Sequence, residues 1–196
     1  MTRDKMIVRQ AKPTDASTIA RIHVDTWRNA YKEIIPDEVL NKLSYEKREK
    51  MWSNTLNNKE NKSIIYVGEI EPQKVVGFVD GGKERMNNPL YKGELYGIYI
   101  LEEYQRKELG KLLVQSLVSE LLKTNIQSML VWVLADNPYR RFYESLDGKQ
   151  VGEKFIKMDD KKLKEIAYGW SDINSILKSI TASARSHLIS TSRICL

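Results

Sequence analysis

The chain has 196 residues, of which 41% are hydrophobic and 30% charged, and its formal net charge is +6. These values suit one globular domain with a substantial core. They exclude a membrane-spanning protein, because no apolar run approaches the roughly 18 residues that a span needs.

The cysteine and histidine counts bound the chemistry further. One cysteine, Cys195, excludes a disulfide framework inside the chain, and two histidines, His23 and His187, argue against a zinc site. We therefore predict no metal. No apolar stretch follows the first residues, so we expect no secretory signal and predict a cytoplasmic location.

The first third of the chain predicts one strand and three helices. Residues 6–11 are expected to form a strand, and Pro13 then marks a helix start with Thr14 or Asp15 as the cap. Further helices are predicted over residues 36–43 and 44–57.

The middle of the chain predicts a hairpin and then a crossover. Residues 63–70 and 74–80 form the hairpin strands, and 94–101 is the next strand. A short basic turn, 105–111, and an amphipathic helix, 112–122, lead to the apolar strand 128–135. The strand–helix–strand order predicts a right-handed parallel crossover.

The last third predicts a short helix over residues 138–146 and a closing hairpin of strands 151–158 and 163–170. We therefore expect a single domain over residues 1–175. Residues 176–196 contain seven Ser or Thr and no acidic residue. Three interpretations stay open for this tail: a C-terminal helix, a flexible segment, or sequence foreign to the natural product.

The basic turn predicts an anion site. A turn that opens a helix directs free backbone N–H groups and the positive end of the helix dipole at one point, which suits a phosphate. Arg106, Lys107 and Lys111 add positive charge there. The alternative is a solvated basic turn without a ligand.

Two motifs on these elements resemble the GNAT superfamily of acyl-CoA N-acyltransferases. The first is Gln/Arg-x-x-Gly-x-Gly/Ala, which reads here as residues 105–110. The second is an Asn six residues before a helical Tyr, with Gly soon after, matched by Asn137, Tyr143 and Gly148. The run from Ala16 to Leu40 also resembles a bacterial branch, and the resemblance spans residues 6–172.

The resemblance implies an α/β fold. Its centre is a mixed, mostly antiparallel sheet of about seven strands, with the parallel crossover described above and helices on both faces. It also implies an N-acetyltransferase that moves an acetyl group from acetyl-CoA to a primary amine, by direct attack within a ternary complex.

One residue departs from the family pattern. Glu108 stands where the family has Gly, whose missing side chain lets the backbone approach a diphosphate. In one interpretation the Glu108 side chain points to solvent and its backbone N–H still binds the diphosphate. In the other, its bulk and charge weaken CoA binding.

The resemblance assigns a cofactor-binding set. The backbone of the central strand would hold the pantetheine arm, the turn would hold the diphosphate, and Asn137 would bond the pantetheine amides. The set comprises Ile98, Tyr99, Ile100, Gln105, Arg106, Lys107, Glu108, Leu109, Gly110, Lys111, Asn137 and Tyr143. Asn137 has an alternative role as the cap of the helix that follows it.

Catalytic and substrate-binding roles complete the prediction. Tyr143 is the candidate general acid for the departing thiolate, and Glu94 is the candidate base, with Glu69 and Asp80 as rivals. Trp27 and Tyr31 are candidate walls of the acceptor pocket, with core packing as the alternative.

Two other function classes stay open at this point. Because of Glu108, the chain could be a non-catalytic acyl-CoA or small-molecule binding module. A nucleic-acid binder is disfavoured, because the chain has no recognisable module and no strongly basic body. Acetyl-CoA and an amine are the expected partners, without nucleic acid or membrane, and a homodimer is plausible.

Overall fold

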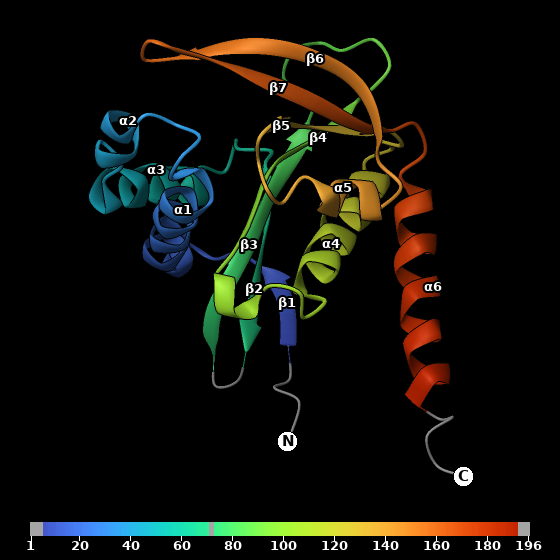
Figure 1. Cartoon of the computed structure of the whole chain (residues 1–196). Coiled ribbons are helices and arrows are strands. Elements are labelled where there is room, and N and C mark those ends of the chain that lie inside the picture. The colour runs from blue at the N-terminus through green and yellow to red at the C-terminus, as the bar shows by residue number, and fades with distance from the viewer. Residues whose placement is uncertain (1–5, 71–72, 192–196) are drawn as a thin grey trace.

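The fold is built on one seven-stranded sheet, seen in the centre and at the top of Figure 1. The computed structural model describes residues 6–70 and 73–191. The sheet order is β1-β2-β3-β4-β5-β7-β6. The strands are β1 (Met6–Gln10), β2 (Ile64–Ile70), β3 (Lys74–Lys83), β4 (Gly93–Ile100), β5 (Met129–Leu134), β6 (Lys149–Met158) and β7 (Lys161–Trp170).

Helices cover both faces of the sheet (Figure 1). Helices α1 (Ala16–Tyr31), α2 (Asp37–Asn41) and α3 (Tyr45–Asn57) gather on one side, and α4 (Leu109–Lys123) and α6 (Asn174–Thr191) lie on the other. A short helix, α5 (Arg141–Ser145), follows β5. All pairings among the described strands are antiparallel except β4 with β5, so the predicted fold class is confirmed.

The main core lies between the sheet and α4. Leu113, Leu117 and Leu121 recur every four residues and are fully buried, as expected for the inner stripe of an amphipathic helix. Strand β5, read from the sequence as apolar on both faces, has five of its six residues buried. Burial on both faces is typical of a central strand with helices above and below.

The feature that positions the site is the short seam between β4 and β5. The two strands pair at Gly93 with Met129 and at Glu94 with Leu130, and the described register contains no pair beyond these. β4 nevertheless continues its pairing with β3 as far as Ile100. From Leu95 onward, the edge of β4 that faces β5 is therefore open.

Several boundaries differ from the sequence predictions. The helix expected over 138–146 begins at Arg141, and the helix expected over 36–43 is α2, which is shorter. Asp15 stands at the start of α1, but its carboxylate accepts from the backbone N–H of Lys12 and pairs with Arg9. The Asp15 side chain therefore stabilises the connection between β1 and α1.

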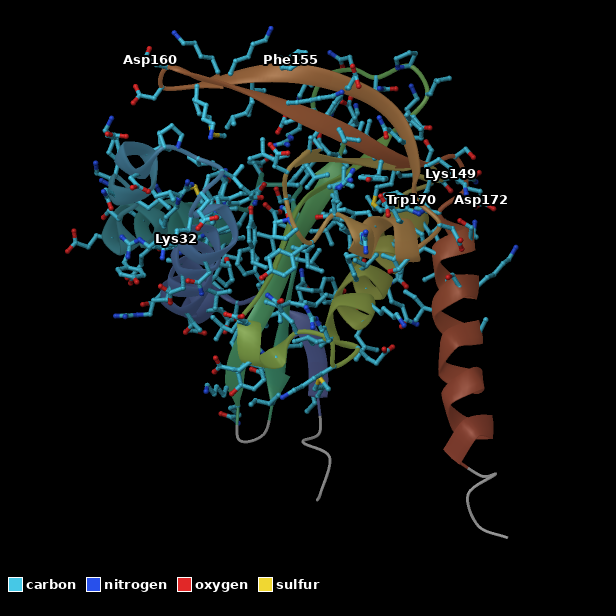
Figure 2. All side chains as sticks on the ribbon, in the orientation of Figure 1. Lys32, Lys149, Phe155, Asp160, Trp170 and Asp172 are labelled. Atoms are coloured by element: carbon cyan, nitrogen blue, oxygen red, sulfur yellow. The ribbon has the colours of Figure 1, made fainter. Side chains whose placement is uncertain are left out.

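The last part of the chain that the structure describes is helical. Helix α6 covers Asn174–Thr191, and Ile176 and Ile180 are buried in the main core. Trp170, at the end of β7, lies near the start of α6 (Figure 2), and its Nε1 donates to the Leu146 carbonyl 2.6 Å away. The division into a domain of residues 1–175 and a separate tail stays a prediction.

Candidate active site

A cavity of about 630 Å³ opens where β4 and β5 separate. Its walls come from the C-terminal half of α1, the open part of β4, the turn before α4, β5, and the segment from Asn137 to Tyr143. Elements from both halves of the sheet thus meet at one place, which is the usual setting for a ligand site.

The turn before α4 has two residues in the left-handed region. Arg106 has φ 57° and Glu108 has φ 69°, a conformation that favours glycine. α4 then begins at Leu109. The first N–H groups of a helix have no partner inside it, so this turn directs donors and the helix dipole toward the cavity.

Glu108 holds the special backbone position that glycine has in the family motif, and it lines the cavity. Its side chain is 56% exposed, and its carboxylate lies 3.1 Å from Lys111 Nζ. The carboxylate is therefore turned partly to solvent, while it also neutralises part of the positive charge of the turn.

The other residues of the turn fall into two groups. Gln105, Arg106, Gly110 and Lys111 line the cavity. Leu109 is buried in the core, so only its backbone can serve the site. Lys107 is not among the lining residues, and its Nζ lies 5.2 Å from the Tyr104 ring centre.

The predicted residues of β4 all line the cavity. Ile98 and Ile100 pack their side chains toward the α4 core, whereas Tyr99 packs on the opposite face. Because the pairing with β5 has ended, this edge of β4 has backbone groups available for an added strand.

Asn137 joins two walls of the cavity. Its Nδ2 donates to the Tyr31 hydroxyl at 3.0 Å, and its Oδ1 accepts from the Tyr139 N–H at 2.8 Å. The side chain is thus used both for the turn before α5 and for contact with α1. The turn agrees with the capping role that was predicted for Asn137, and its binding to the pantetheine amides stays a prediction.

Tyr143 lies on α5 and faces the cavity. Burial, with smaller effects from Tyr31 and Tyr99, raises the pKa of the Tyr143 phenol well above its usual range. Gly148 lets the chain pass close behind it, because a Cβ there would lie 2.7 Å from both the Tyr143 carbonyl oxygen and the Trp170 ring.

The raised pKa of Tyr143 restricts its chemistry. A thiol has a pKa of about 8.5, so full proton transfer from this phenol to a thiolate is uphill. A hydrogen bond that strengthens as the thiolate forms, with the proton replaced as it leaves, is the role that the geometry allows.

The two predicted acceptor-wall residues differ in position. Tyr31 lines the cavity, whereas Trp27 lies behind it with the ring centres 5.0 Å apart. Trp27 Nε1 donates to the Tyr99 hydroxyl at 3.1 Å. Trp27 therefore supports the wall, and the Tyr99 hydroxyl, which sequence reasoning did not single out, belongs to the site.

Glu94 lies outside the main cavity. It lines a recess of about 200 Å³ that shares Tyr96 and Trp132 with the main cavity. Its carboxylate accepts from the backbone N–H and from two guanidinium nitrogens of Arg85. The lone pairs of this candidate base are thus strongly engaged.

The two rivals of Glu94 differ from each other. Glu69 lies on β2 and forms an ion pair with Arg9 of β1 at 2.6 Å, and β3 stands between β2 and the seam. Asp80 sits on β3 opposite Gly97 of β4, which lines the cavity. Of these two, only Asp80 lies next to a cavity residue in the sheet register.

Sequence reasoning missed most of the aromatic lining. Tyr96, Trp132, Tyr139 and Phe142 contribute to the cavity. Tyr96 and Trp132 flank the β4–β5 seam, and the other two neighbour the Asn137/Tyr143 motif. The parallel crossover that the sequence predicted pairs the strands of Tyr96 and Trp132, and it is the signal that could have located these two residues.

The described residues contain no cluster of three or more His, Cys, Asp or Glu that could hold a metal ion. Within the same residues, no helix combines the length and apolar character that crossing a bilayer requires.

Comparison with known sequences supplies the family. The model of the FR47-like protein family matches residues 75–156. The uncharacterized N-acetyltransferase YuaI of Bacillus subtilis (strain 168) is 38% identical over 170 residues, which cover 86% of this chain and 95% of YuaI. The chain belongs to the GNAT superfamily of acyl-CoA N-acyltransferases. A spermidine N(1)-acetyltransferase of Thermoplasma acidophilum is 23% identical over 132 residues, covering 66% and 79% of the two chains.

Solved structures agree with the fold of this GNAT acetyltransferase. An N-acetyltransferase from Staphylococcus aureus Mu50 superposes with a TM-score of 0.64 at 20% identity, covering 86% of this chain and 99% of that one. YncA from Salmonella typhimurium, solved with its cofactor acetyl-CoA, gives 0.63 at 18% identity, covering 85% and 93%. The family prediction is confirmed, and the protein is an acyltransferase.

Proposed function

We propose that this GNAT enzyme transfers an acetyl group from acetyl-CoA to a primary amine by direct attack within a ternary complex. The observation that carries the proposal is the cavity at the β4–β5 separation, which reaches from the N-terminus of α4 to Tyr143. The relatives solved with acetyl-CoA and named for spermidine acetylation support the choice of both substrates.

The turn of residues 105–111 binds the diphosphate in this proposal. Main-chain N–H groups at the start of α4 and the side chains of Arg106 and Lys111 supply donors and positive charge. A helix N-terminus with basic neighbours is a common phosphate site. Lys107 acts at longer range, beside Tyr104.

The open edge of β4 holds the pantetheine arm. The backbone at Ile98 and Ile100 bonds the arm as if it were an added strand, and one N–H polarises the thioester carbonyl. Such a donor contributes about 10²–10³ in rate when it is aimed at the developing oxyanion. Asn137 holds the amide region of the arm from the opposite wall.

Tyr143 then stabilises the leaving thiolate. Its buried O–H belongs to α5, and Tyr31 and Tyr99 are two further phenols in the lining of the cavity. The amine enters from the α1 side. Tyr31 forms the wall of the cavity there, and Trp27 packs behind Tyr31.

The test combines binding with turnover. Calorimetry with acetyl-CoA should give saturable binding to the full chain, and a panel of primary amines that includes spermidine should give thiol release above the rate without amine. Absence of both binding and thiol release would contradict the proposal. The control is desulfo-CoA, which should bind without releasing thiol.

A further inference from the structure

Asp80 of β3 carries a polar atom that the rest of the fold leaves unsatisfied. Its Oδ1 is the buried side-chain nitrogen or oxygen without a hydrogen-bond partner in the described part of the chain. Leaving a buried acceptor unpaired costs about 1–3 kcal/mol. Native proteins keep few such atoms, and those that remain often serve a function.

Asp80 lies beside a residue of the cavity wall. In the sheet register Asp80 faces Gly97, a cavity residue without a side chain. A Cβ on Gly97 would lie 2.9 Å from the Tyr99 hydroxyl and 2.6 Å from Cε2 of the same ring. The phenol of Tyr99 therefore lies across Gly97.

Sheet geometry then brings the two polar groups within reach. Cβ atoms of directly opposite residues lie about 4.5–5.5 Å apart. The Tyr99 hydroxyl lies 2.9 Å from the position of a Cβ on Gly97, on the face that Asp80 shares, and because Asp80 Oδ1 has no direct hydrogen-bond partner among the described residues, one water can join the two groups. Any side chain at position 97 would displace the phenol.

The Tyr99 hydroxyl is oriented to pass a proton. It accepts a hydrogen bond from Trp27 Nε1 at 3.1 Å, so its own proton remains for another partner. His23 stacks on the ring at 4.7 Å, and burial, with a smaller effect from Arg48, lowers the pKa of that imidazole to about 3. The neighbouring histidine is neutral and does not compete for the proton.

Asp80 is also poised to exchange protons near neutrality. Burial raises the pKa of its carboxyl to about 7, with Glu94 acting in the same direction and Arg85 and the Gly81 N–H opposing it. Tyr96 and Tyr99 are the other titratable groups on β4 that its charge affects, and the positive charge of Arg48 on α3 also acts on Tyr99. Glu94 is already occupied by Arg85, whereas Asp80 Oδ1 is free.

We propose that Tyr99 and Asp80 form a relay that removes the proton from the acceptor ammonium, an assignment that rests on the proposed function. The ammonium gives a proton to the Tyr99 oxygen, the Tyr99 proton passes to a bridging water, and that water gives a proton to Asp80 Oδ1. The neutral amine then forms the C–N bond as the C–S bond breaks. A second nitrogen proton replaces the one supplied through Tyr143 to the thiolate, and Asp80 releases its proton to solvent.

The first test is the pH dependence of kcat/KM, measured with acetyl-CoA and the amine that gives the fastest thiol release. The wild type should lose activity as the pH falls through about 7. Asp80→Asn and Tyr99→Phe should each lower kcat/KM about 10²-fold and abolish that acidic limb, with acetyl-CoA binding retained. Asp160→Asn is the matched control, because Asp160 lies at the tip of the β6–β7 hairpin (Figure 2) and its side chain is fully exposed.

The outcomes separate this relay from the proposed function. An active wild type whose acidic limb persists in Asp80→Asn overturns the relay and leaves the acetyltransferase assignment intact. Loss of the limb in Glu94→Gln, with the limb kept in Asp80→Asn, assigns the base to Glu94 and also overturns it.

A second measurement does not depend on turnover. Carbon-13 NMR of aspartate-labelled protein, with Asp80→Asn to assign the resonance, should show the Asp80 carboxyl titrating near neutral pH. Tyr99→Phe should shift that titration, whereas Asp160→Asn should not. A midpoint near the ordinary value of about 4, or no response to Tyr99→Phe, overturns the relay.

Discussion

Asn137 Nδ2 donates to the Tyr31 hydroxyl at 3.0 Å and thereby joins α1 to the segment after β5, across 106 positions of the chain. Asn137 is 8% exposed. Tyr31→Phe should lower the free energy of unfolding by about 1–3 kcal/mol, because it leaves the buried Nδ2 donor unpaired. Chemical denaturation measures the change.

The double-mutant cycle with Asn137→Ala is the control for this contact. The double variant should be more stable than the sum of the two single changes implies, because the shared hydrogen bond can be lost only once. Strict additivity would mean that the bond contributes nothing to stability.

Glu108→Gly should tighten acetyl-CoA binding. The change removes a side chain from a left-handed backbone position and removes a negative charge from the anion site. Isothermal calorimetry should give a Kd lower by about tenfold, which corresponds to roughly 1.4 kcal/mol. Glu108→Gln is the matched control, since it removes the charge and keeps the backbone strain. Equal or weaker binding by Glu108→Gly would refute the expectation.

Tyr143→Phe should lower kcat by about 10²-fold and change KM little. The phenyl ring of the variant still fills the buried space, while the O–H that stabilises the thiolate is removed. Steady-state thiol release measures both constants. Phe142→Leu, on the neighbouring position of α5, tests whether packing alone accounts for the loss, and an unchanged kcat in Tyr143→Phe would remove the role.

Asp80→Asn should stabilise the protein increasingly as the pH rises. The folded-state pKa of Asp80 is raised from 3.8 to about 7. A raised pKa means that the folded state holds the extra proton, so this contribution to stability is complete below the unfolded pKa and is lost as the pH passes the folded pKa. The variant escapes that loss.

Thermal unfolding of both proteins at about pH 5 and about pH 8 measures this difference. The gain of the variant over the wild type should grow by about 2–4 kcal/mol between the two conditions. Asp160→Asn should show no such dependence. A constant gain across pH would mean that Asp80 ionises normally in the folded protein.

The sequence predicted the succession of strands and helices, the parallel crossover and a turn before α4, because hydrophobic periodicity and short motifs are local signals. Strand β5 was recognised from its apolar run, and Asn137 and Tyr143 from their spacing. The boundary of α5 was placed too early, because Asn137 organises a turn over residues 138–140 before the helix begins.

The acceptor side could not be read from the sequence, since it depends on contacts between distant segments. The pairing of Glu94 with Arg85 and the placing of Tyr99 across Gly97 follow from strand register and from a bulge between Asp80 and Gly81. Neither contact produces a repeating pattern of residues in the sequence. Trp27 packs against the core, which was one of its two predicted roles, and its Nε1 donates to the Tyr99 hydroxyl, whereas its role as a wall of the acceptor pocket stays a prediction.

The short seam between β4 and β5 has a mechanical consequence. With two residue pairs in the described register joining the halves of the sheet, the molecule resembles two stiff plates that share a narrow hinge. A bound thioester arm would add backbone hydrogen bonds along the open edge of β4 and hold the two parts of the sheet in a fixed position relative to each other. The loaded enzyme should therefore exchange its amide hydrogens more slowly in both halves, including strands that the ligand never touches.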